Sequence, residues 1–365
     1  MGIIELFKTL LRFKSITPND DGAFEFIRNY LGSDWQEIEL NREGVKNSLF
    51  YKKFGSGEHL CFAGHIDVVP VGEGWSCDPF EAFENGDEII ARGAQDMKSG
   101  VAAFLHACKN ATNFSGTLSI LLTSDEEGDG VFGTRIMLEH LKEIDFLPDF
   151  AIVAEPTCEE VFGDAIKVGR RGSINGVLEL FGKQGHAAYP EKSINPVELI
   201  APILPQIAGI NLDDGDEYFS ASKLVITDIR AGMEVTNVTP GKLKMMFNVR
   251  NSTKTDTQKV QDFINSKFDG LDFTLKLNGN TKPFVTDKNS KIVQVLSDAV
   301  FENLQIRPKN STAGGTSDAR FFGILQIPTV EFGVINDTIH SVNERTSKTE
   351  VKALAEIFET VIENF

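Results

Sequence analysis

Four apolar segments of this chain run directly into residues that can bind a metal ion. The first covers residues 60–69 and contains the motif GHIDVVP, in which His65 and Asp67 are two positions apart. Side chains two positions apart on a β-strand point to the same face. His65 and Asp67 therefore match an imidazole ligand and the carboxylate that orients it. An ordinary strand that ends in polar residues gives the same short pattern, so this motif alone does not distinguish a metal site from a plain strand end.

The same arrangement recurs at three later points. The strands and the polar residues that follow them are 117–123 with Glu126 and Glu127, 150–154 with Glu155, and 328–333 with His340. A further candidate, Asp96, stands just before an amphipathic helix predicted over residues 98–110. In open α/β sheets, ligands bind beyond the carboxyl ends of the strands. We therefore expect one edge of a sheet to gather His65, Asp96, Glu127, Glu155 and His340.

The order of the predicted elements indicates two architectures. Up to Glu155, and again near the C-terminus, strands alternate with helices, which predicts an α/β fold with a mostly parallel sheet and helices on both faces. In between, the order becomes strand–helix–strand–strand–helix–strand, typical of a ferredoxin-like α+β sandwich, with one helix expected over residues 196–207. We expect a catalytic domain of residues 1–171 and 286–365 and an inserted domain of residues 172–285.

Charge and cysteine content exclude several classes of protein. The 365 residues carry a formal net charge of −17, which argues against nucleic acid and anionic membrane surfaces as partners. No apolar stretch is long enough to span a bilayer. The four cysteines are scattered and form no C-x-x-C pair. This usage suits the reducing cytoplasm and argues against both a disulfide framework and a thiolate zinc site.

The candidate ligands fit a pair of divalent cations. Two cations about 3.5–4 Å apart need a shared carboxylate and terminal ligands on each side, and one Asp, two Glu and two His meet that need for zinc. Asp96 is the best candidate for the shared carboxylate. Glu126 and Glu127 diverge as neighbours, so one can bind metal while the other takes a proton from water whose pKa the metal has lowered. Two alternatives remain. The chain could be a hydrolase that binds a single metal ion, or the segment with Glu126 and Glu127 could be an ordinary acidic turn.

The sequence indicates the residues that bind substrate less specifically than it indicates the metal ligands. His186, in the motif GKQGHAAYP, is either a surface histidine of no consequence or a donor to a developing oxyanion. Arg170 and Arg250 suit a substrate carboxylate, although ordinary surface ion pairs fit them equally well. Residues 313–318, with the sequence AGGTSD, are either a plain turn or an anion-binding turn.

Eight motifs together resemble those of the dinuclear zinc aminoacylase/carboxypeptidase superfamily of metallohydrolases. They follow the order of that superfamily and span most of the chain: GHIDVVP, ARGAQDMKSG, TSDEEG, AEPT, VGRRGS, GKQGHAAYP, GGTSDARF and NDTIHSVNE. Within the superfamily the chain looks most like the succinyl-diaminopimelate desuccinylases. That closer resemblance depends mainly on VGRRGS, GGTSDARF and the loop that contains the histidine.

The resemblance implies roles for the metal-site residues. Asp96 would bridge two zinc ions, for which cobalt can substitute. His65 and Glu155 would complete one metal site, and Glu127 and His340 the other. Glu126 would be the general base and Asp67 the partner of His65.

The resemblance also implies how substrate is held. His186, supplied by a second subunit, would stabilise the tetrahedral intermediate. The succinyl carboxylate would be held by Arg170, Tyr189, Asn237, Arg250, Gly315 and Thr316. Ser173 and Asn336 would lie near the diaminopimelate end.

The implied activity is hydrolysis of a small anionic N-acyl amino acid. The substrate would be N-succinyl-LL-2,6-diaminopimelate, cleaved to succinate and LL-2,6-diaminopimelate in lysine and diaminopimelate biosynthesis by a cytoplasmic homodimer with an inserted lid domain. The nearest alternatives are an acetylornithine deacetylase or a dipeptidase with the same metal site. A non-catalytic metal-binding protein of the same fold is a third hypothesis, against which Glu126 argues because such a protein would not need it.

Overall fold

The computed structural model describes residues 1–365, apart from the side chain of residue 280. The chain forms two compact units. The first comprises Met1–Gly169, Val285–Ser311 and Ser317–Phe365, and the second comprises Arg170–Phe284 and Thr312–Thr316. The sequence does not predict the short return of residues 312–316 to the second unit, because no change of composition marks it.

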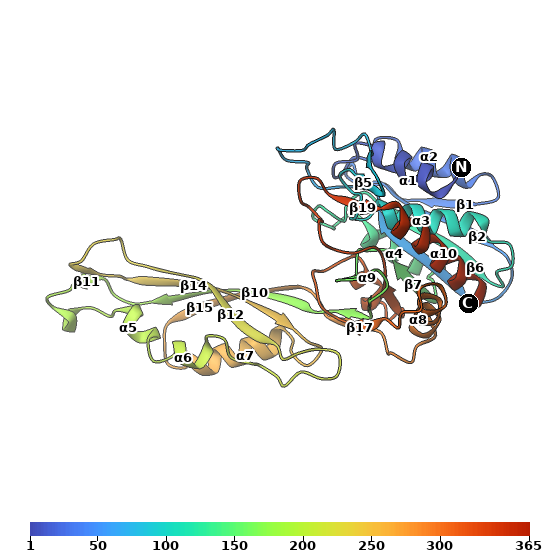
Figure 1. The fold of residues 1–365 in the computed structure, drawn as a ribbon. Coiled ribbons are helices and arrows are strands. Elements are labelled where there is room, and N and C mark those ends of the chain that lie inside the picture. The colour runs from blue at the N-terminus through green and yellow to red at the C-terminus, as the bar shows by residue number, and fades with distance from the viewer. The chain divides into compact units, whose positions relative to one another are not determined.

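The first unit is built on an eight-stranded sheet with the order β1-β2-β6-β3-β7-β18-β8-β17. Figure 1 labels five of its strands, β1, β2, β6, β7 and β17. The strands are Gln36–Glu39 (β1), Asn47–Lys53 (β2), His59–His65 (β3), Thr117–Thr123 (β6), Phe150–Val153 (β7), Ala165–Lys167 (β8), Lys309–Ser311 (β17) and Thr329–Glu331 (β18). β3 runs parallel to β6 and β7, and β18 runs parallel to β7. The predicted α/β class with a mostly parallel sheet is confirmed.

Helices cover both faces of this sheet. Every residue of β3 and β6 is buried, and since side chains alternate between the faces of a strand, both faces must be covered. The helices are Ile3–Arg12 (α1), Ala23–Leu31 (α2), Lys98–Asn110 (α3), Thr134–Glu143 (α4), Lys291–Leu304 (α8), Ala319–Ile324 (α9) and Lys348–Asn364 (α10). α3 packs against α1 and α10, whereas α4 packs against α9.

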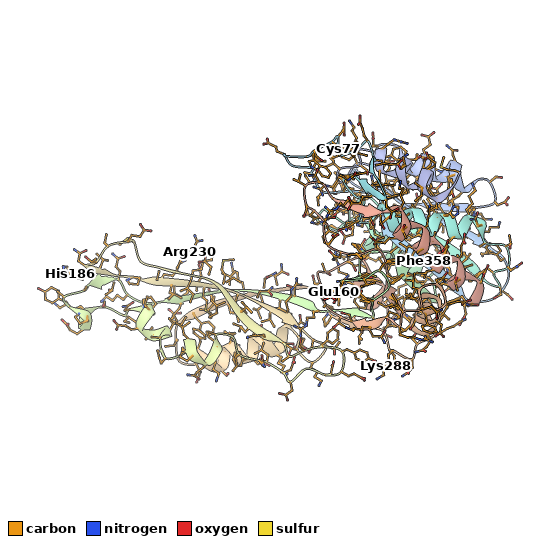
Figure 2. All side chains as sticks on the ribbon, in the orientation of Figure 1. Cys77, Glu160, His186, Arg230, Lys288 and Phe358 are labelled. Carbon is orange, nitrogen blue, oxygen red and sulfur yellow. The ribbon has the colours of Figure 1, made fainter. Side chains whose placement is uncertain are left out.

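A continuous apolar core fixes the strands in register beneath these helices. Phe62 of β3 meets Phe358 of α10 with their ring centroids 5.2 Å apart, and both side chains are fully buried; Figure 2 labels Phe358. Because β3, β6, β7 and β18 are held in this parallel arrangement, their carboxyl ends meet at one edge of the sheet.

A small antiparallel sheet joins two loops of the first unit. It contains Phe83–Asn85 (β4), Glu88–Ile90 (β5) and Arg345–Ser347 (β19), in the order β19-β5-β4. Arg345 of β19 is the register partner of Ile90 of β5. The residues just after β5 are therefore held next to those just before β19.

The second unit is a four-stranded antiparallel sheet with helices on one face. The strands Gly172–Phe181 (β10), Lys223–Ala231 (β12), Lys242–Asn251 (β14) and Phe273–Thr281 (β15) have the order β12-β14-β10-β15. Leu178 and Met245 of the sheet pack in one core with Val260 and Ile264 of helix Thr257–Lys267 (α7). The predicted ferredoxin-like order of strands and helices is confirmed.

Short elements complete the two units. They are Gly169–Arg170 (β9), Gly185–His186 (β11), Pro190–Lys192 (a 3₁₀ turn), Val238–Thr239 (β13) and Phe284–Val285 (β16). β11 pairs with β13, which brings the His186 motif next to residue 238.

The single helix predicted over residues 196–207 is wrong. The structure has two short helices, Pro196–Ile200 (α5) and Leu204–Ile207 (α6). Proline lacks a backbone N–H and its ring clashes with the preceding turn of a helix. Pro202 and Pro205 therefore interrupt the helix, and Pro205 is tolerated only because it lies in the first turn of α6.

No helix in the described chain combines the length and the apolar character needed to cross a membrane. All four cysteines are free thiols, and three of them are buried. The three buried cysteines act as small core residues in this fold.

We expect Gly100→Ala to destabilise the protein, because α3 packs there directly against the end of β7. A Cβ at Gly100 would lie 2.2 Å from the main-chain oxygen of Ala154, a fixed atom that cannot rotate away. Overpacking of this kind costs about 1–3 kcal/mol, which outweighs the gain of up to about 1 kcal/mol in helix propensity. Urea denaturation measures the difference. Gly2→Ala, where a Cβ meets nothing within 4 Å, is the control, and equal stability of both variants would contradict the packing.

Candidate functional site

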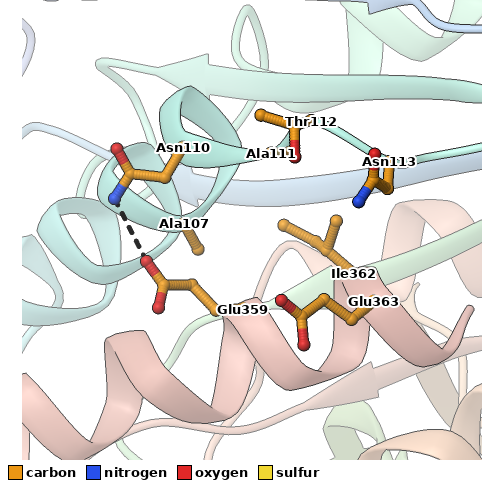
Figure 3. Close-up of a pocket in the computed structure, with 8 residues that line it drawn as sticks. All are labelled: Ala107, Asn110, Ala111, Thr112, Asn113, Glu359, Ile362 and Glu363. Carbon is orange, nitrogen blue, oxygen red and sulfur yellow. Dashed lines mark hydrogen bonds between the residues drawn. The ribbon is translucent and has the colours of Figure 1, made fainter.

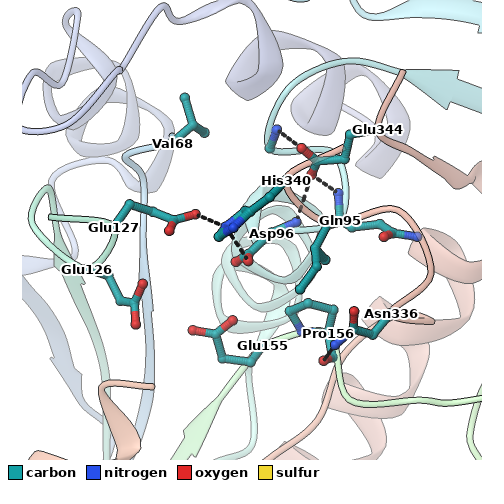
Figure 4. Close-up of polar contacts among 12 residues, drawn as sticks. Val68, Gln95, Asp96, Glu126, Glu127, Glu155, Pro156, Asn336, His340 and Glu344 are labelled. Atoms are coloured by element: carbon teal, nitrogen blue, oxygen red, sulfur yellow. Dashed lines mark hydrogen bonds and ion pairs between the residues drawn. The ribbon is translucent and has the colours of Figure 1, made fainter. Parts of the chain in front are cut away.

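The ends of the parallel strands place the candidate ligands together (Figure 4). His65 is the last residue of β3, Glu126 and Glu127 follow β6, and Glu155 follows β7. Asp96 lies just before α3, and His340 lies on the loop before β19. All of them belong to the first unit.

His65, Asp96 and Glu155 form the first cluster of potential ligands. One atom of each side chain lies within 4.8 Å of the others. His65 Nε2 is 3.1 Å from Asp96 Oδ1 and 3.8 Å from Glu155 Oε1. His65 is fully buried and Glu155 is 7% exposed, so little water reaches these groups.

Asp96, Glu127 and His340 form the second cluster. His340 Nε2 is 2.9 Å from Glu127 Oε1 and 3.4 Å from Asp96 Oδ2. Asp96 thus directs one carboxylate oxygen to each histidine and belongs to both clusters. A carboxylate that bridges two cations needs this arrangement.

A third set of three residues, His65, Glu126 and Glu127, meets the same 4.8 Å criterion. Glu126 Oε2 lies 4.0 Å from His65 Nε2, and Glu127 is the one of the two glutamates that contacts His340. The two neighbouring carboxylates therefore have different surroundings: one lies in the second cluster and the other at the margin of the first.

Asp67 holds the turn that carries the two glutamates. Its Oδ1 accepts from the backbone N–H of Glu126 at 3.4 Å, and its Oδ2 accepts from the N–H of Glu127 at 3.2 Å. Thr17 Oγ1 also donates to Oδ2, at 2.6 Å. His65 Nδ1 lies 2.9 Å from the main-chain oxygen of Asp67 and 3.6 Å from Oδ1. The spacing in the sequence predicts the proximity of Asp67 to His65, but it reveals neither Thr17 nor the contact with the glutamate turn.

Burial changes the proton affinity of the carboxylates. It raises the pKa of Glu155 well above its ordinary value, and the negative charge of Asp96 acts in the same direction. Burial likewise raises the pKa of Glu126. Crowded carboxylates in a water-poor site need compensating positive charge.

The two histidines supply that charge when no cation is bound. Burial opposes protonation of His65, but its hydrogen bond to Asp96 and the nearby carboxylates outweigh burial and raise its pKa. Hydrogen bonds to Asp96 and Glu127 raise the pKa of His340 to about 10. Two imidazoles and three carboxylates are a suitable donor set for a pair of zinc-like cations, so these residues fit a dinuclear metal centre.

Comparison with known proteins identifies the family. A sequence profile of Peptidase family M20/M25/M40 matches residues 61–364. The chain belongs to this family. A succinyl-diaminopimelate desuccinylase from Aliarcobacter butzleri is 66% identical over 366 residues, which cover 100% of both chains. The predicted resemblance to the desuccinylases is confirmed, and so is the prediction of a hydrolase.

Solved structures support the fold. An aminopeptidase PepT from Bacillus cereus has a TM-score of 0.80 at 19% identity, with 99% of this chain and 97% of that chain covered. A Bacillus subtilis protein described as a dinuclear metal-binding peptidase of the M20 family has a TM-score of 0.72 at 16% identity, with 99% and 96% covered. At these identities the match shows the shared fold alone.

The predicted substrate residues fall in both units of this M20 family member. Asn336 lies in the first unit, where its Nδ2 donates to the main-chain oxygen of Pro156 at 3.3 Å, next to Glu155. The second unit contains Arg170, Ser173, Tyr189, Asn237, Arg250, Gly315 and Thr316, together with His186.

Within the second unit these residues form three groups. The rings of His186 and Tyr189 are 5.8 Å apart, and the N–H after His186 donates to the main-chain oxygen of Asn237. Ser173 and Arg250 are register partners on β10 and β14. Arg170 Nη1 donates to the main-chain oxygen of Ala313 at 3.0 Å, in the segment that contains Gly315 and Thr316. His186, labelled in Figure 2, is exposed.

A pocket of about 240 Å³ lies apart from these ligands. It is formed by the C-terminal end of α3 and the end of α10 (Figure 3), where Asn110 Nδ2 donates to Glu359 Oε1 at 3.1 Å. Asp96 is at the opposite end of α3, and a helix of this length spans about 20 Å. The pocket therefore lies outside the candidate metal centre.

In the metal-free protein, we expect His340 to stabilise the fold only while it is protonated. Its pKa is raised from 6.5 to about 10 in the folded chain, so its contribution is complete below about pH 6.5 and is lost as the pH rises through about 10. The difference in unfolding free energy between the native chain and His340→Asn should shrink over this range. Urea denaturation with EDTA measures it, and His140→Asn, on α4, is the control. A difference that is constant or grows with pH would contradict the ion pairing.

Proposed function

We propose that this chain hydrolyses the amide of N-succinyl-LL-2,6-diaminopimelate, giving succinate and LL-2,6-diaminopimelate. The observation that carries the proposal is the 66% identity over full length with a protein named for this activity. The ligand clusters around Asp96 support it, because amide hydrolysis at neutral pH needs a strongly activated water. The reaction serves lysine and diaminopimelate synthesis.

The proposed cofactor is a pair of Zn²⁺ ions. His65 and Glu155 would hold one ion and Glu127 and His340 the other, with Asp96 shared between them. Bound cations of this kind polarise an amide carbonyl and lower the pKa of water. Co²⁺ accepts the same nitrogen and oxygen donors and is expected to substitute.

Glu126 is the proposed general base. It lies on the turn held by Asp67, within 4.0 Å of His65, whereas its neighbour Glu127 is the glutamate that contacts His340. Glu126 is therefore the one of the two that we assign to proton transfer. It would take a proton from the attacking water and deliver that proton to the amide nitrogen as the C–N bond breaks. Burial raises the pKa of Glu126, which suits a carboxylate that has to hold a proton between two steps.

The second unit is proposed to supply substrate contacts. His186, from the partner subunit, would donate to the developing oxyanion. Arg170, Tyr189, Asn237, Arg250, Gly315 and Thr316 would hold the succinyl carboxylate, and Ser173 and Asn336 the diaminopimelate end. The exposed positions of His186 and Arg250 and the suitability of arginine for carboxylates support this assignment.

We also propose a cytoplasmic homodimer formed through the second unit. β12 is an edge strand of its sheet, and Val225 and Ile229 of β12 and Met246 of β14 are exposed. An exposed apolar edge strand is a template for pairing with another strand. The four free cysteines support a reducing compartment.

We expect Glu126→Gln to lower kcat by about 100-fold or more, because the amide cannot accept the proton of water. Zinc content, measured by atomic absorption, should remain that of the native chain, since the amide retains the shape of the side chain. Glu127→Gln is the matched control. It should lose metal, because Glu127 is a proposed ligand of the ion that His340 also holds and the amide carries no negative charge. Unchanged kcat in Glu126→Gln would remove Glu126 from the mechanism.

A substrate panel separates the proposal from its nearest alternatives. N-succinyl-LL-2,6-diaminopimelate should have a higher kcat/KM than N-acetylornithine and than dipeptides, because its succinyl carboxylate would meet the arginines of the second unit. Faster hydrolysis of N-acetylornithine or of a dipeptide would overturn the choice of substrate and leave the metal centre intact.

We expect Val225→Asp combined with Ile229→Asp to convert a dimer to a monomer in sedimentation velocity, because the charges would oppose pairing of two β12 edges. Thr274→Asp, on the opposite edge strand β15, is the control and should leave the dimer intact. A native chain that sediments as a monomer would contradict the proposed assembly.

A further inference from the structure

Glu344 is a fully buried carboxylate that none of the roles above uses. It accepts four hydrogen bonds, all from residues 92–96, and Figure 4 shows those from Gln95 and Asp96. Its Oε2 accepts from Arg92 Nη1 at 2.8 Å and from the N–H of Gly93 at 3.0 Å. Its Oε1 accepts from the N–H of Gln95 at 2.9 Å and from the N–H of Asp96 at 3.1 Å. The backbone of the bridging carboxylate is therefore bonded directly to Glu344.

Arg92 extends this contact to a third loop. It is 2% exposed, and its Nη2 donates to the main-chain oxygen of Val71 at 3.2 Å and of Pro70 at 3.4 Å. Its Nη1 also donates to the main-chain oxygen of Ser341 at 3.2 Å. One guanidinium thus joins the loop after Asp67 to the loop that contains His340.

Gln95 joins its own segment, residues 92–96, to the loop that contains His340. Its Oε1 accepts from the N–H of Thr338 at 2.8 Å, and its Nε2 donates to Asp337. The paired strands β5 and β19 lie immediately beside these contacts, and the N–H of Ala91 donates to the main-chain oxygen of Glu344 at 3.0 Å. Two segments 248 positions apart in the sequence are in this way joined into one hydrogen-bonded piece.

This piece carries two of the three residues in the second ligand cluster, Asp96 and His340. His340 has a φ of 57°, a left-handed conformation that a residue other than glycine keeps only when its surroundings enforce it. The first cluster is supported differently, because His65 ends β3 and Glu155 follows β7. The second cluster therefore depends on Arg92 and Glu344 more than the first does.

Stability alone is a poor explanation for these two side chains. A buried Arg–carboxylate pair contributes little net stability compared with well-packed apolar residues. What the pair does provide is a fixed geometry, with a planar guanidinium and a carboxylate that each bind several partners in set directions.

We propose that Arg92 and Glu344 form a positioning clamp, which sets the separation of Asp96 and His340 and thereby the affinity for the cation held by Asp96, Glu127 and His340. The clamp's role rests on the proposed metal centre and not on the proposed substrate. Contacts around a metal centre commonly change metal affinity by about 10- to 100-fold.

The test is a titration of the metal-free full-length chain with Co²⁺. Calorimetry measures the binding, and the visible absorption of bound Co²⁺ reports the surroundings of each ion. Glu344→Gln keeps the size of the side chain but turns an NH₂ group toward N–H donors. We expect the native chain to bind two Co²⁺ and the variant to bind one of them about 10-fold more weakly or worse. The absorption of the weakened site should change as well.

Glu350→Gln is the matched control. Glu350, like Glu344, is a carboxylate that accepts a hydrogen bond from a loop N–H, although it is only partly buried. Its donors are the N–H of Ile335 at 3.1 Å and Ser347 Oγ at 3.0 Å. It touches neither Asp96 nor His340. We expect its Co²⁺ titration and absorption to match those of the native chain, even if the variant unfolds at a lower urea concentration.

Arg92→Lys tests the clamp independently of Glu344, including the case in which Glu344→Gln does not fold. Lysine keeps the positive charge but cannot reach all four acceptors of Arg92. We therefore expect a loss of affinity for the same Co²⁺ that is smaller than the loss in Glu344→Gln. Native Co²⁺ binding in each variant that folds would overturn the clamp while leaving the metal centre standing. A native chain that does not bind two Co²⁺ would overturn the metal centre and the clamp together.

Discussion

The carboxylate of Asp96 is the group on which the rest of the site depends. One oxygen faces His65 and the other faces His340, so candidate ligands from distant parts of the chain converge on a single side chain. Bringing several carboxylates together away from water is unfavourable unless positive charge compensates them. The parallel sheet holds them together nevertheless, because its apolar core fixes the strand ends regardless of the charges that follow.

The two units divide the proposed work. The first unit contains both clusters of candidate ligands and Glu126, the proposed general base. The second contains most of the residues proposed to bind the succinyl carboxylate and the histidine proposed for the oxyanion. Related amidohydrolases with different substrates would therefore differ mainly in the second unit, whereas the chemistry around Asp96 would stay the same.

The sequence predicts the sheet and the proximity of the candidate ligands, because both follow from local patterns. Apolar runs such as residues 117–123 define strands, and polar residues directly after them must lie at the edge of the sheet. The contacts of Glu344 are not predictable in this way, because they join residues 248 positions apart and depend on the shapes of two loops. The single helix predicted over residues 196–207 fails for a local reason. Its apolar pattern is helical, but Pro202 cannot continue a helix.

Anomalous diffraction at the zinc edge, from crystals of the full-length chain grown with zinc, would locate the bound ions relative to Asp96. We expect two peaks about 3.5–4 Å apart, one on each side of Asp96, with His65 and Glu155 at the first and Glu127 and His340 at the second. A single peak, or a pair of peaks that Asp96 does not bridge, would contradict this expectation.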